Sequence, residues 1–330
     1  MRWIYRRLIT LALTIYVSIT ITFILVRLMP GNPVDVLIQQ YLMMGYSYEE
    51  ALTAVEALLP FLPTDPLPKQ YIDFIINIFK GDLGKSIILG IPVTQLLVYA
   101  IPWTVFIAGL ALILSFTVGV ILGMFMAYRR GSILDKALSL IASVLGSFPS
   151  YAIGVLLALF LGIRFELFPV LGAYGPNVEP GFNLNFIIDV LYHAFLPVLS
   201  YFLVTFGGWM LTMKSSTTSV LGEYYVIAAE ARGLPERRIV ITYVGRNAIL
   251  PLFTRFAISL GYIFGGSVFI ETIYSYPGVG RYLVDAITTR DYILMTGIFL
   301  VITFAVVLAN FVADLVYSWI DPRARVMEEI

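Results

Sequence analysis

The stretch PWTVFIAGLALILSFTVGVILGMFMAY, residues 102–128, carries no charged side chain and decides the class of fold. An α-helix rises about 1.5 Å per residue, so about 20 apolar residues cross the roughly 30 Å of hydrocarbon in a bilayer. Five more apolar runs of similar length lie near residues 8–29, 137–163, 193–214, 249–274 and 293–320. The sequence therefore predicts an all-α polytopic membrane protein with six transmembrane helices.

The composition of the 330 residues agrees with a membrane protein, with 59% hydrophobic and only 13% charged residues. The 21 basic and 21 acidic side chains balance, which gives no reason to expect a nucleic acid partner. Cysteine is absent, so disulfides and thiolate metal sites are excluded. The first apolar run is long and is not followed by a small-residue cleavage site, and we interpret it as a retained span rather than a signal peptide.

Basic residues predict the orientation of the spans. With the N-terminus inside, inner segments hold thirteen Lys and Arg and outer segments hold seven, as the positive-inside rule requires. Both termini are then cytoplasmic. We predict a first transmembrane helix at 1–29, an extracytoplasmic subdomain of short helices at 30–92, a core of five helices at 93–320 with a cytoplasmic loop at 215–248, and a cytoplasmic tail at 321–330. Ser47 and Glu50 predict a capping box at a subdomain helix.

Candidate catalytic and nucleotide sites are weak. GDLGKSI, residues 81–87, is similar to the end of a phosphate-binding loop, but the position that requires the first glycine is Phe79. No acidic pair, nucleophile with a base, or metal-ligand cluster lies within the spans. His193 is the only histidine, and we interpret it as an anchor at the membrane interface.

The polar stretch EYYVIAAEARGLPERRIVITYVGRNAILP, residues 223–251, interrupts the apolar pattern. It predicts a short helix that Thr218 or Ser219 caps and that Arg232, Gly233 and Pro235 end. Small and flat side chains would form a docking surface on it: Tyr224, Tyr225, Ala228, Ala229 and Ala231. The alternative is an amphipathic helix in the lipid headgroups, although such a helix normally carries more Lys and Arg.

Several residues within the spans carry further predictions. Gly119 and Gly123, like Gly261 and Gly265, are spaced four apart and favour close helix packing. Pro149 and Pro197 are expected to interrupt spans three and four, either beside an aqueous path or as simple kinks.

Few charged residues are buried within the predicted spans. Arg255 is expected to snorkel to the cytoplasmic surface, and Asp314 lies in the inner half of span six. Glu271 is either a substrate or gate contact or the partner of Arg281 in an ion pair at the outer rim. Candidate residues of a translocation path are Ser147, Ser150, Tyr201, Thr205, Ser259, Tyr262 and Glu271.

Short motifs along nearly the whole chain then point to one family. They lie at residues 28–33, 81–84, 147–150, 223–234, 246–251, 271–280, 290–292 and 321–323. The strongest block runs from Glu223 through Arg232-Gly233-Leu234 and Tyr276-Pro277-Gly278-Val279-Gly280 to Arg290-Asp291-Tyr292. On these residues the chain resembles the first of the two membrane subunits of dipeptide and oligopeptide ABC importers, the type I importer permeases.

The resemblance implies a cytoplasmic coupling helix, the EAA loop, that seats in a groove on an ATPase. It would comprise Glu223, Tyr224, Tyr225, Ala228, Ala229, Ala231, Arg232, Gly233, Leu234 and Pro235. Implied partners are a homologous second permease, two ATP-binding subunits that hold ATP and Mg, and an extracytoplasmic substrate-binding protein. The chain itself would be a multi-pass subunit of the plasma (inner) membrane that binds no cofactor and is not an enzyme.

Three positions depart from the family pattern. The opening Glu-Ala-Ala falls at Ile227-Ala228-Ala229, Glu230 stands where close relatives usually carry a basic residue, and Gly245 replaces a larger apolar one. The resemblance favours peptide import, with oligosaccharide import by the same architecture as an alternative. A stand-alone channel or ion-coupled transporter is a third hypothesis, which predicts more charge near the membrane midplane than this sequence offers.

Overall fold

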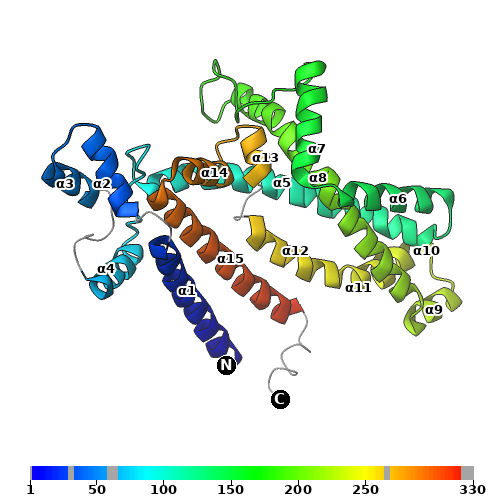
Figure 1. Ribbon diagram of the computed structural model, residues 1–330. Helices are drawn as coiled ribbons and strands as arrows, with labels where there is room; N and C mark the ends of the chain where they lie inside the picture. The colour runs from blue at the N-terminus through cyan, green and yellow to red at the C-terminus, as the bar shows by residue number, and fades with distance from the viewer. Residues whose placement is uncertain (1, 29–32, 58–65, 264–267, 321–330) are drawn as a thin grey trace.

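The computed structural model describes residues 2–28, 33–57, 66–263 and 268–320, and these residues form helices and their connections (Figure 1). The described residues contain no β-strand beyond one isolated bridge between Lys85 and Pro92. The predicted all-α class is therefore confirmed. The α-helices are α1 (Arg2–Leu28), α2 (Pro33–Met43), α3 (Tyr48–Glu56), α4 (Leu67–Phe79), α5 (Val93–Tyr128), α6 (Ile133–Ser147), α7 (Ser150–Leu157), α8 (Leu184–Leu221), α9 (Tyr224–Ala231), α10 (Glu236–Arg238), α11 (Arg246–Ala248), α12 (Leu250–Tyr262), α13 (Val268–Ile273), α14 (Val279–Thr289) and α15 (Tyr292–Ile320). Two π-helical segments, η1 (Ala158–Arg164) and η2 (Ile239–Gly245), extend α7 and precede α11.

Four helices, α1, α5, α8 and α15, are long and apolar enough to cross a membrane. They contain the first, second, fourth and sixth predicted spans. The 36 residues of α5 correspond to about 54 Å at 1.5 Å per residue, more than a bilayer core requires. Pro102 lies inside this helix instead of starting it.

The third and fifth predicted spans are not single straight helices. Pro149 separates α6 from α7, and the pair α6 and α7–η1 bends by 97° at this break, as the sequence predicted. The expectation for Pro197 is wrong, because α8 continues through it from Leu184 to Leu221. Proline removes one backbone hydrogen bond, and packing of α8 against α5 stabilises the helix across that point. The fifth region comprises α12 and α13.

Some predictions fall where the structure gives no description. These are the motif residues 29–32, the tail at 321–330 and Gly265, and the side chains of Tyr262 and Asp314.

Close packing between α5 and α8 organises the core. A Cβ atom on Gly119 would lie 2.5 Å from Trp209 Cβ, and one on Gly123 would lie 2.3 Å from the Met210 carbonyl oxygen. A Cβ atom on Gly207 of α8 would likewise crowd the backbone of Ala142 in α6. Glycine thus lets these backbones approach, as predicted. Gly261 similarly packs against Ala309, where α12 lies along α15.

Helices α2, α3 and α4 lie at one end of the molecule, whereas α1 runs along α15 (Figure 1). Ser47 and Glu50 form the predicted capping box of α3. Thr20 of α1 and Tyr71 of α4 are hydrogen bonded at 2.5 Å, and Phe23 packs on the same tyrosine ring. The connection between α4 and α5 is held by Asp291 at the start of α15, which accepts a hydrogen bond from Ser86 Oγ at 2.5 Å.

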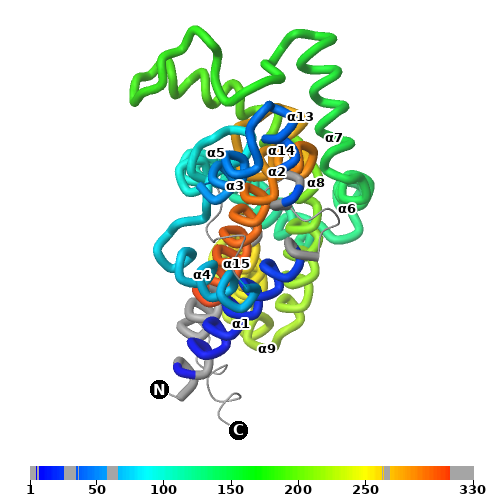
Figure 2. Tube along the Cα trace, turned by 60° about the vertical axis from the view of Figure 1, so that its left-hand side comes forward, coloured from blue at the N-terminus to red at the C-terminus, as the bar shows by residue number. Residues whose placement is uncertain are grey.

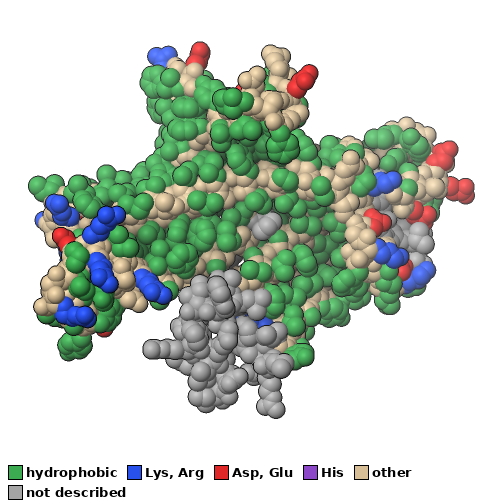
Figure 3. Space-filling view, turned by 180° about the vertical axis from the view of Figure 1, so that it is seen from behind, with side chains coloured by type: hydrophobic (Ala, Val, Ile, Leu, Met, Phe, Trp, Pro, Cys, Tyr) green, Lys and Arg blue, Asp and Glu red, His purple; other side chains and the backbone are tan. Residues whose placement is uncertain are grey.

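The segment between η1 and α8, shown in green, extends beyond the remaining helices (Figure 2). Its base is fixed to the core, since Gly172 N donates to the Tyr274 carbonyl oxygen at 2.9 Å and Trp103 packs near Tyr174. Hydrophobic side chains cover most of the face in Figure 3, whereas Lys, Arg, Asp and Glu gather at the left and right ends and at the top of the view. An apolar belt between polar ends fits a protein that lies across a bilayer.

Candidate functional site

The predicted docking helix is α9, a helix of eight residues between two tight connections. Glu223 precedes it in an extended conformation and makes no side-chain cap. Thr218 and Ser219, the predicted caps, lie instead in the last turns of α8. Their hydroxyls donate to the carbonyl oxygens of Lys214 and Ser215, so the predicted capping is wrong. Serine and threonine within a helix commonly bond the backbone four residues earlier.

The end of α9 is as predicted. Arg232 caps its last turn, and Gly233 follows with φ +68°, a left-handed conformation that glycine adopts without strain. Pro235 then lies in extended backbone and begins α10. The connection therefore reverses direction within three residues.

One face of α9 is exposed and mostly apolar. Tyr224 is 88% exposed, and Ile227, Ala228 and Ala231 lie on the same side of the helix. Ala229 differs from the other alanines of the predicted docking surface, because it is buried. The exposed face of α9 therefore holds fewer residues than the docking surface predicted from the sequence.

The inner face of α9 packs on the segment that follows it. Val226 and Ala229 join Ile239 and Val244 of η2 in one buried cluster. Burial raises the pKa of the Tyr225 phenol, and the nearby Glu223 carboxylate raises it further, so this tyrosine is neutral at physiological pH. Because α9 is packed on η2, the two segments are expected to move together.

The segment from α10 to α11 connects α9 to the long helices. Ser216 of α8 donates from Oγ to the Ala248 carbonyl oxygen at 2.7 Å. A Cβ atom on Gly245 would lie 3.0 Å from Val240 O and 3.3 Å from Met124 Cε of α5. A larger side chain at position 245 would therefore be crowded by these atoms. α9 is thus joined through short contacts to both α5 and α8.

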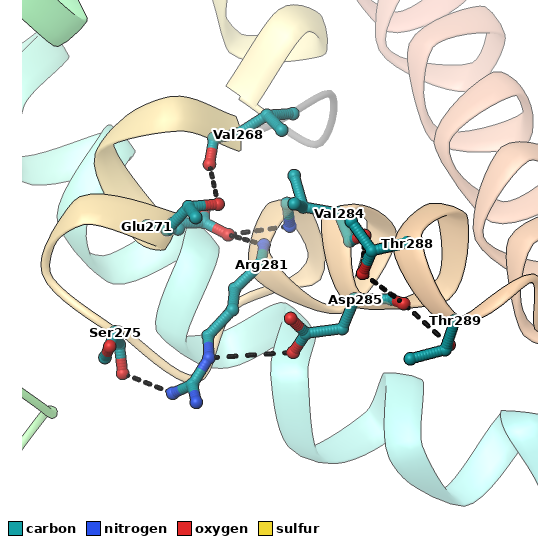
Figure 4. Close-up of polar contacts among 10 residues, drawn as sticks. Val268, Glu271, Ser275, Arg281, Val284, Asp285, Thr288 and Thr289 are labelled. Atoms are coloured by element: carbon teal, nitrogen blue, oxygen red, sulfur yellow. Dashed lines mark hydrogen bonds and ion pairs between the residues drawn. The ribbon is translucent and has the colours of Figure 1, made fainter. Parts of the chain in front are cut away.

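Glu271 lies at a second polar centre, where α13 meets the start of α14 (Figure 4). Its side chain is fully buried at 0% exposure. Oε2 accepts hydrogen bonds from Gly280 N at 2.6 Å and from Arg281 N at 3.3 Å. Thr104 of α5 accepts from Val279 N at 2.8 Å through Oγ1. Side chains from two other helices therefore bind the first N–H groups of α14, which otherwise have no intrahelical partner.

Glycines make this arrangement fit. A Cβ atom on Gly278 would lie 2.4 Å from Glu271 Oε2, and one on Gly280 would lie 2.9 Å from the same oxygen. Larger residues would displace the carboxylate. The motif Tyr276-Pro277-Gly278-Val279-Gly280 therefore has a structural reason for both of its glycines.

Arg281 contacts Glu271 through its backbone N–H, while its guanidinium points elsewhere (Figure 4). Nη1 donates to the Ser275 carbonyl oxygen at 2.6 Å, and Nε lies 3.7 Å from Asp285 Oδ2. The expected rim ion pair is thus replaced by backbone capping. Burial also places Glu271 inside the protein rather than on an open surface.

The remaining candidate path residues that the structure describes lie on α8, at the bend between α6 and α7, and on α12. Tyr201 and Thr205 lie half-buried on α8, where Thr205 is hydrogen bonded to Ser115 of α5 at 2.7 Å. Ser147 and Ser150 flank the bend between α6 and α7, which packs on the same part of α8. Ser259 lies on α12, where its Oγ donates to the Arg255 carbonyl oxygen.

Sequence reasoning missed Thr104, Asp291 and the pair formed by Asp135 and Lys214. Lys214 Nζ lies 2.5 Å from Asp135 Oδ1 and also donates to Ser139, which joins α8 to α6. Their partners are more than 70 residues away in each case, so local spacing could not predict these contacts. His193 is buried and its Nδ1 lies 2.9 Å from the Asp189 carbonyl oxygen. Within the described ranges no group of three metal-ligating side chains is present.

These features define the class: a polytopic helical membrane protein with an exposed short helix between two of its long segments. Residues 119–326 match the family of binding-protein-dependent transport system inner membrane components. The chain belongs to this family, and it is a multi-pass protein of the plasma membrane.

Curated relatives match it over almost their whole length. A di/tripeptide transport system permease protein, DppB of Pseudomonas aeruginosa (strain UCBPP-PA14), is 32% identical over 98% of both chains. A probable peptide ABC transporter permease protein, y4tP of Sinorhizobium fredii, is 34% identical over 98% of this chain and 99% of its own. The dipeptide transport system permease protein DppB of Escherichia coli K12 is 32% identical with the same coverage.

Proposed function

We propose that this chain is a permease subunit of an ATP-driven importer and forms half of the translocation path for di- or oligopeptides. The observation that carries this proposal is the similarity of this chain to three peptide permeases. Each match covers 98% of this chain. Such coverage includes the spans, the outer helices and the segment around α9. The family description, an inner membrane component of binding-protein-dependent transport, agrees with it.

In this proposal the outward face of α9 seats on a cytoplasmic ATPase. Two ATP-binding subunits hold ATP and Mg, while this chain supplies no nucleotide site and is not itself an enzyme. A homologous second permease completes the path, and an extracytoplasmic binding protein delivers the peptide. The exposed Tyr224, Ile227, Ala228 and Ala231 support this role, because small and flat side chains allow a close approach.

The contacts behind α9 support transmission of movement. Its buried face packs on η2, and Ser216 and Gly245 connect the segment from η2 to α11 with α8 and α5. Closure of the ATPases would displace α9, and these contacts would pass the displacement to the long helices. Packed elements move as bodies rather than deform continuously.

Gly233 offers a direct test of coupling. Nothing lies within 4 Å of a Cβ atom built there, so a substitution acts through its φ of +68° and not through a clash. A residue other than glycine pays about 1–2 kcal/mol for left-handed backbone, less for asparagine. Gly233→Val is therefore expected to lower substrate-stimulated ATPase activity of the assembled complex by roughly tenfold. Gly233→Asn is the matched control and should keep most of the activity.

Co-purification of all subunits with the Gly233→Val chain shows that assembly is intact. Peptide uptake into proteoliposomes tests the substrate class at the same time. Full coupling in the valine variant would refute the role of α9. Uptake of oligosaccharides without peptides by the wild-type complex would refute the substrate.

A further inference from the structure

Arg255 is the only charged residue of α12 and lies within its apolar sequence LPLFTRFAISLGY. Its guanidinium carbon is 5.0 Å from the centre of the Trp209 ring. Nη1 donates to Thr212 Oγ1 at 3.2 Å. These two contacts with α8 hold the cation in one orientation.

The side chain of Arg255 contacts α8 at Trp209 and Thr212. The bond between Ser216 and Ala248 marks where α11 meets α8. Arg255 lies seven residues further along, roughly 10 Å at the rise of a helix. Nη2 is 3.9 Å from the position of a Cβ atom on Gly208, so the guanidinium lies beside Gly208, Trp209 and Thr212 of α8.

No carboxylate pairs with Arg255 among the residues that the structure describes. Lys214, about one turn away along α8, differs in being bound to Asp135. The guanidinium has five N–H donors, and Arg255 is exposed on the surface of the chain. A charge on an apolar helix is costly in lipid, so it is expected to face protein or a water-filled path.

Polar and small residues lead along α8 to this arginine. Tyr201, Thr205, Gly208 and Thr212 follow one another at spacings of four, three and four, which places them on one face of the helix. All four are half-buried or exposed, and α5 covers part of this face, where Ser115 is hydrogen bonded to Thr205. A face that touches only lipid would carry large apolar side chains instead, as α8 does at Ile188 and Leu191.

We propose that Arg255 binds the C-terminal carboxylate of a peptide as the peptide passes along this face of α8. The inference rests on the proposed function, since it concerns the same path. A guanidinium matches the two oxygens of a carboxylate. Every linear peptide with a free C-terminus carries that group, whatever its side chains. Trp209 covers one side of the guanidinium and Thr212 fixes its rotation, so the ligand approaches from the open side.

The test compares uptake of one tripeptide as its free acid and as its C-terminal amide. The complete complex with its binding protein is reconstituted in proteoliposomes, and the acid-to-amide ratio of each variant is divided by that of the wild type. This division removes the preference of the binding protein. Arg255→Gln is expected to lower the ratio by about tenfold, the value of one charge-assisted hydrogen bond. Arg164→Gln removes an exposed charge away from this face and should leave the ratio unchanged.

If the complex with Arg255→Gln does not assemble, a second pair of variants at Gly208 provides the test. Gly208→Asp puts a carboxylate beside Arg255, where nothing lies closer than 3.9 Å to the new Cβ atom. It should compete with the peptide and lower the ratio, whereas Gly208→Asn should not. Equal slowing of both peptides, or a change that depends on the anionic lipid content, would overturn the proposal. Absence of all peptide uptake in the wild type would refute the proposed function instead.

Discussion

Removing the Glu271 carboxylate should loosen the junction between α13 and α14. The carboxylate is fully buried and accepts the Gly280 and Arg281 N–H groups at 2.6 and 3.3 Å. Hydrogen bonds to a charged group contribute about 1.5–3 kcal/mol, and a buried N–H left without a partner costs about 1–3 kcal/mol. Glu271→Ala should therefore destabilise the protein by about 3 kcal/mol. Glu271→Gln keeps an acceptor oxygen and should cost only about 1 kcal/mol. Most of this cost comes from loss of the negative charge near the N-terminus of α14.

The measurement is the thermal unfolding midpoint of the purified complex, ranked across variants at one scan rate because unfolding of large assemblies is commonly irreversible. Thr104→Val removes the neighbouring acceptor for Val279 N. Since both residues cap α14, the double variant should differ from the sum of the single effects. Asp285→Asn is the control, because its pair with Arg281 at 3.7 Å is exposed and contributes little.

The contrary result is equally specific. If Glu271→Gln changes the order in which peptides are transported while the midpoint stays at the wild-type value, Glu271 contacts substrate and the capping role is refuted.

Two further variants test the packing. Gly123→Val should lower the unfolding midpoint strongly, because its Cβ atom would lie 2.3 Å from the Met210 carbonyl oxygen and force α5 from α8; Gly109→Ala, whose nearest neighbour is 4.0 Å away, should leave it unchanged or raise it. An equal effect of both would show that α5 and α8 do not depend on this contact. Asp291→Ala should increase proteolysis of the connection between α4 and α5, because Ser86 Oγ and Ile88 N lose their acceptor. Ser86→Ala serves as the comparison. Unchanged cleavage in the Asp291→Ala variant would contradict the tether between Ser86 and Asp291.

Local chemistry accounts for the parts of the fold that were predicted correctly. Long apolar runs identified α1, α5, α8 and α15, and glycine spacing predicted close packing on α5 without identifying α8 as its partner. Ser47 with Glu50 predicted a cap whose partners are three residues apart. Gly233 and Pro235 predicted the end of α9 because their backbone preferences are intrinsic.

The incorrect and missing predictions depend on tertiary structure. Pro149 and Pro197 are chemically identical, yet only Pro149 breaks a helix, because neighbouring helices stabilise α8 through Pro197. Thr218 and Ser219 were assigned to the wrong helix since α8 extends to Leu221. Ala229 was assigned to the outer face of α9, although η2 covers it. Glu271 and Thr104 meet at α14 from distant parts of the chain, and sequence spacing contains no signal for such an encounter.

The tether between Ser86 and Asp291 also has a consequence for biosynthesis. The two residues are separated by 205 positions, and the apolar cluster beside them joins Val93 and Leu97 to Tyr292 and Ile298. At about 5–20 residues per second, translation leaves the start of α5 without these partners for roughly 10–40 s. A nascent chain that stalls before α15 thus presents an untethered connection between α4 and α5 and bare apolar side chains. Quality-control proteases are therefore expected to recognise incomplete chains by these exposed segments.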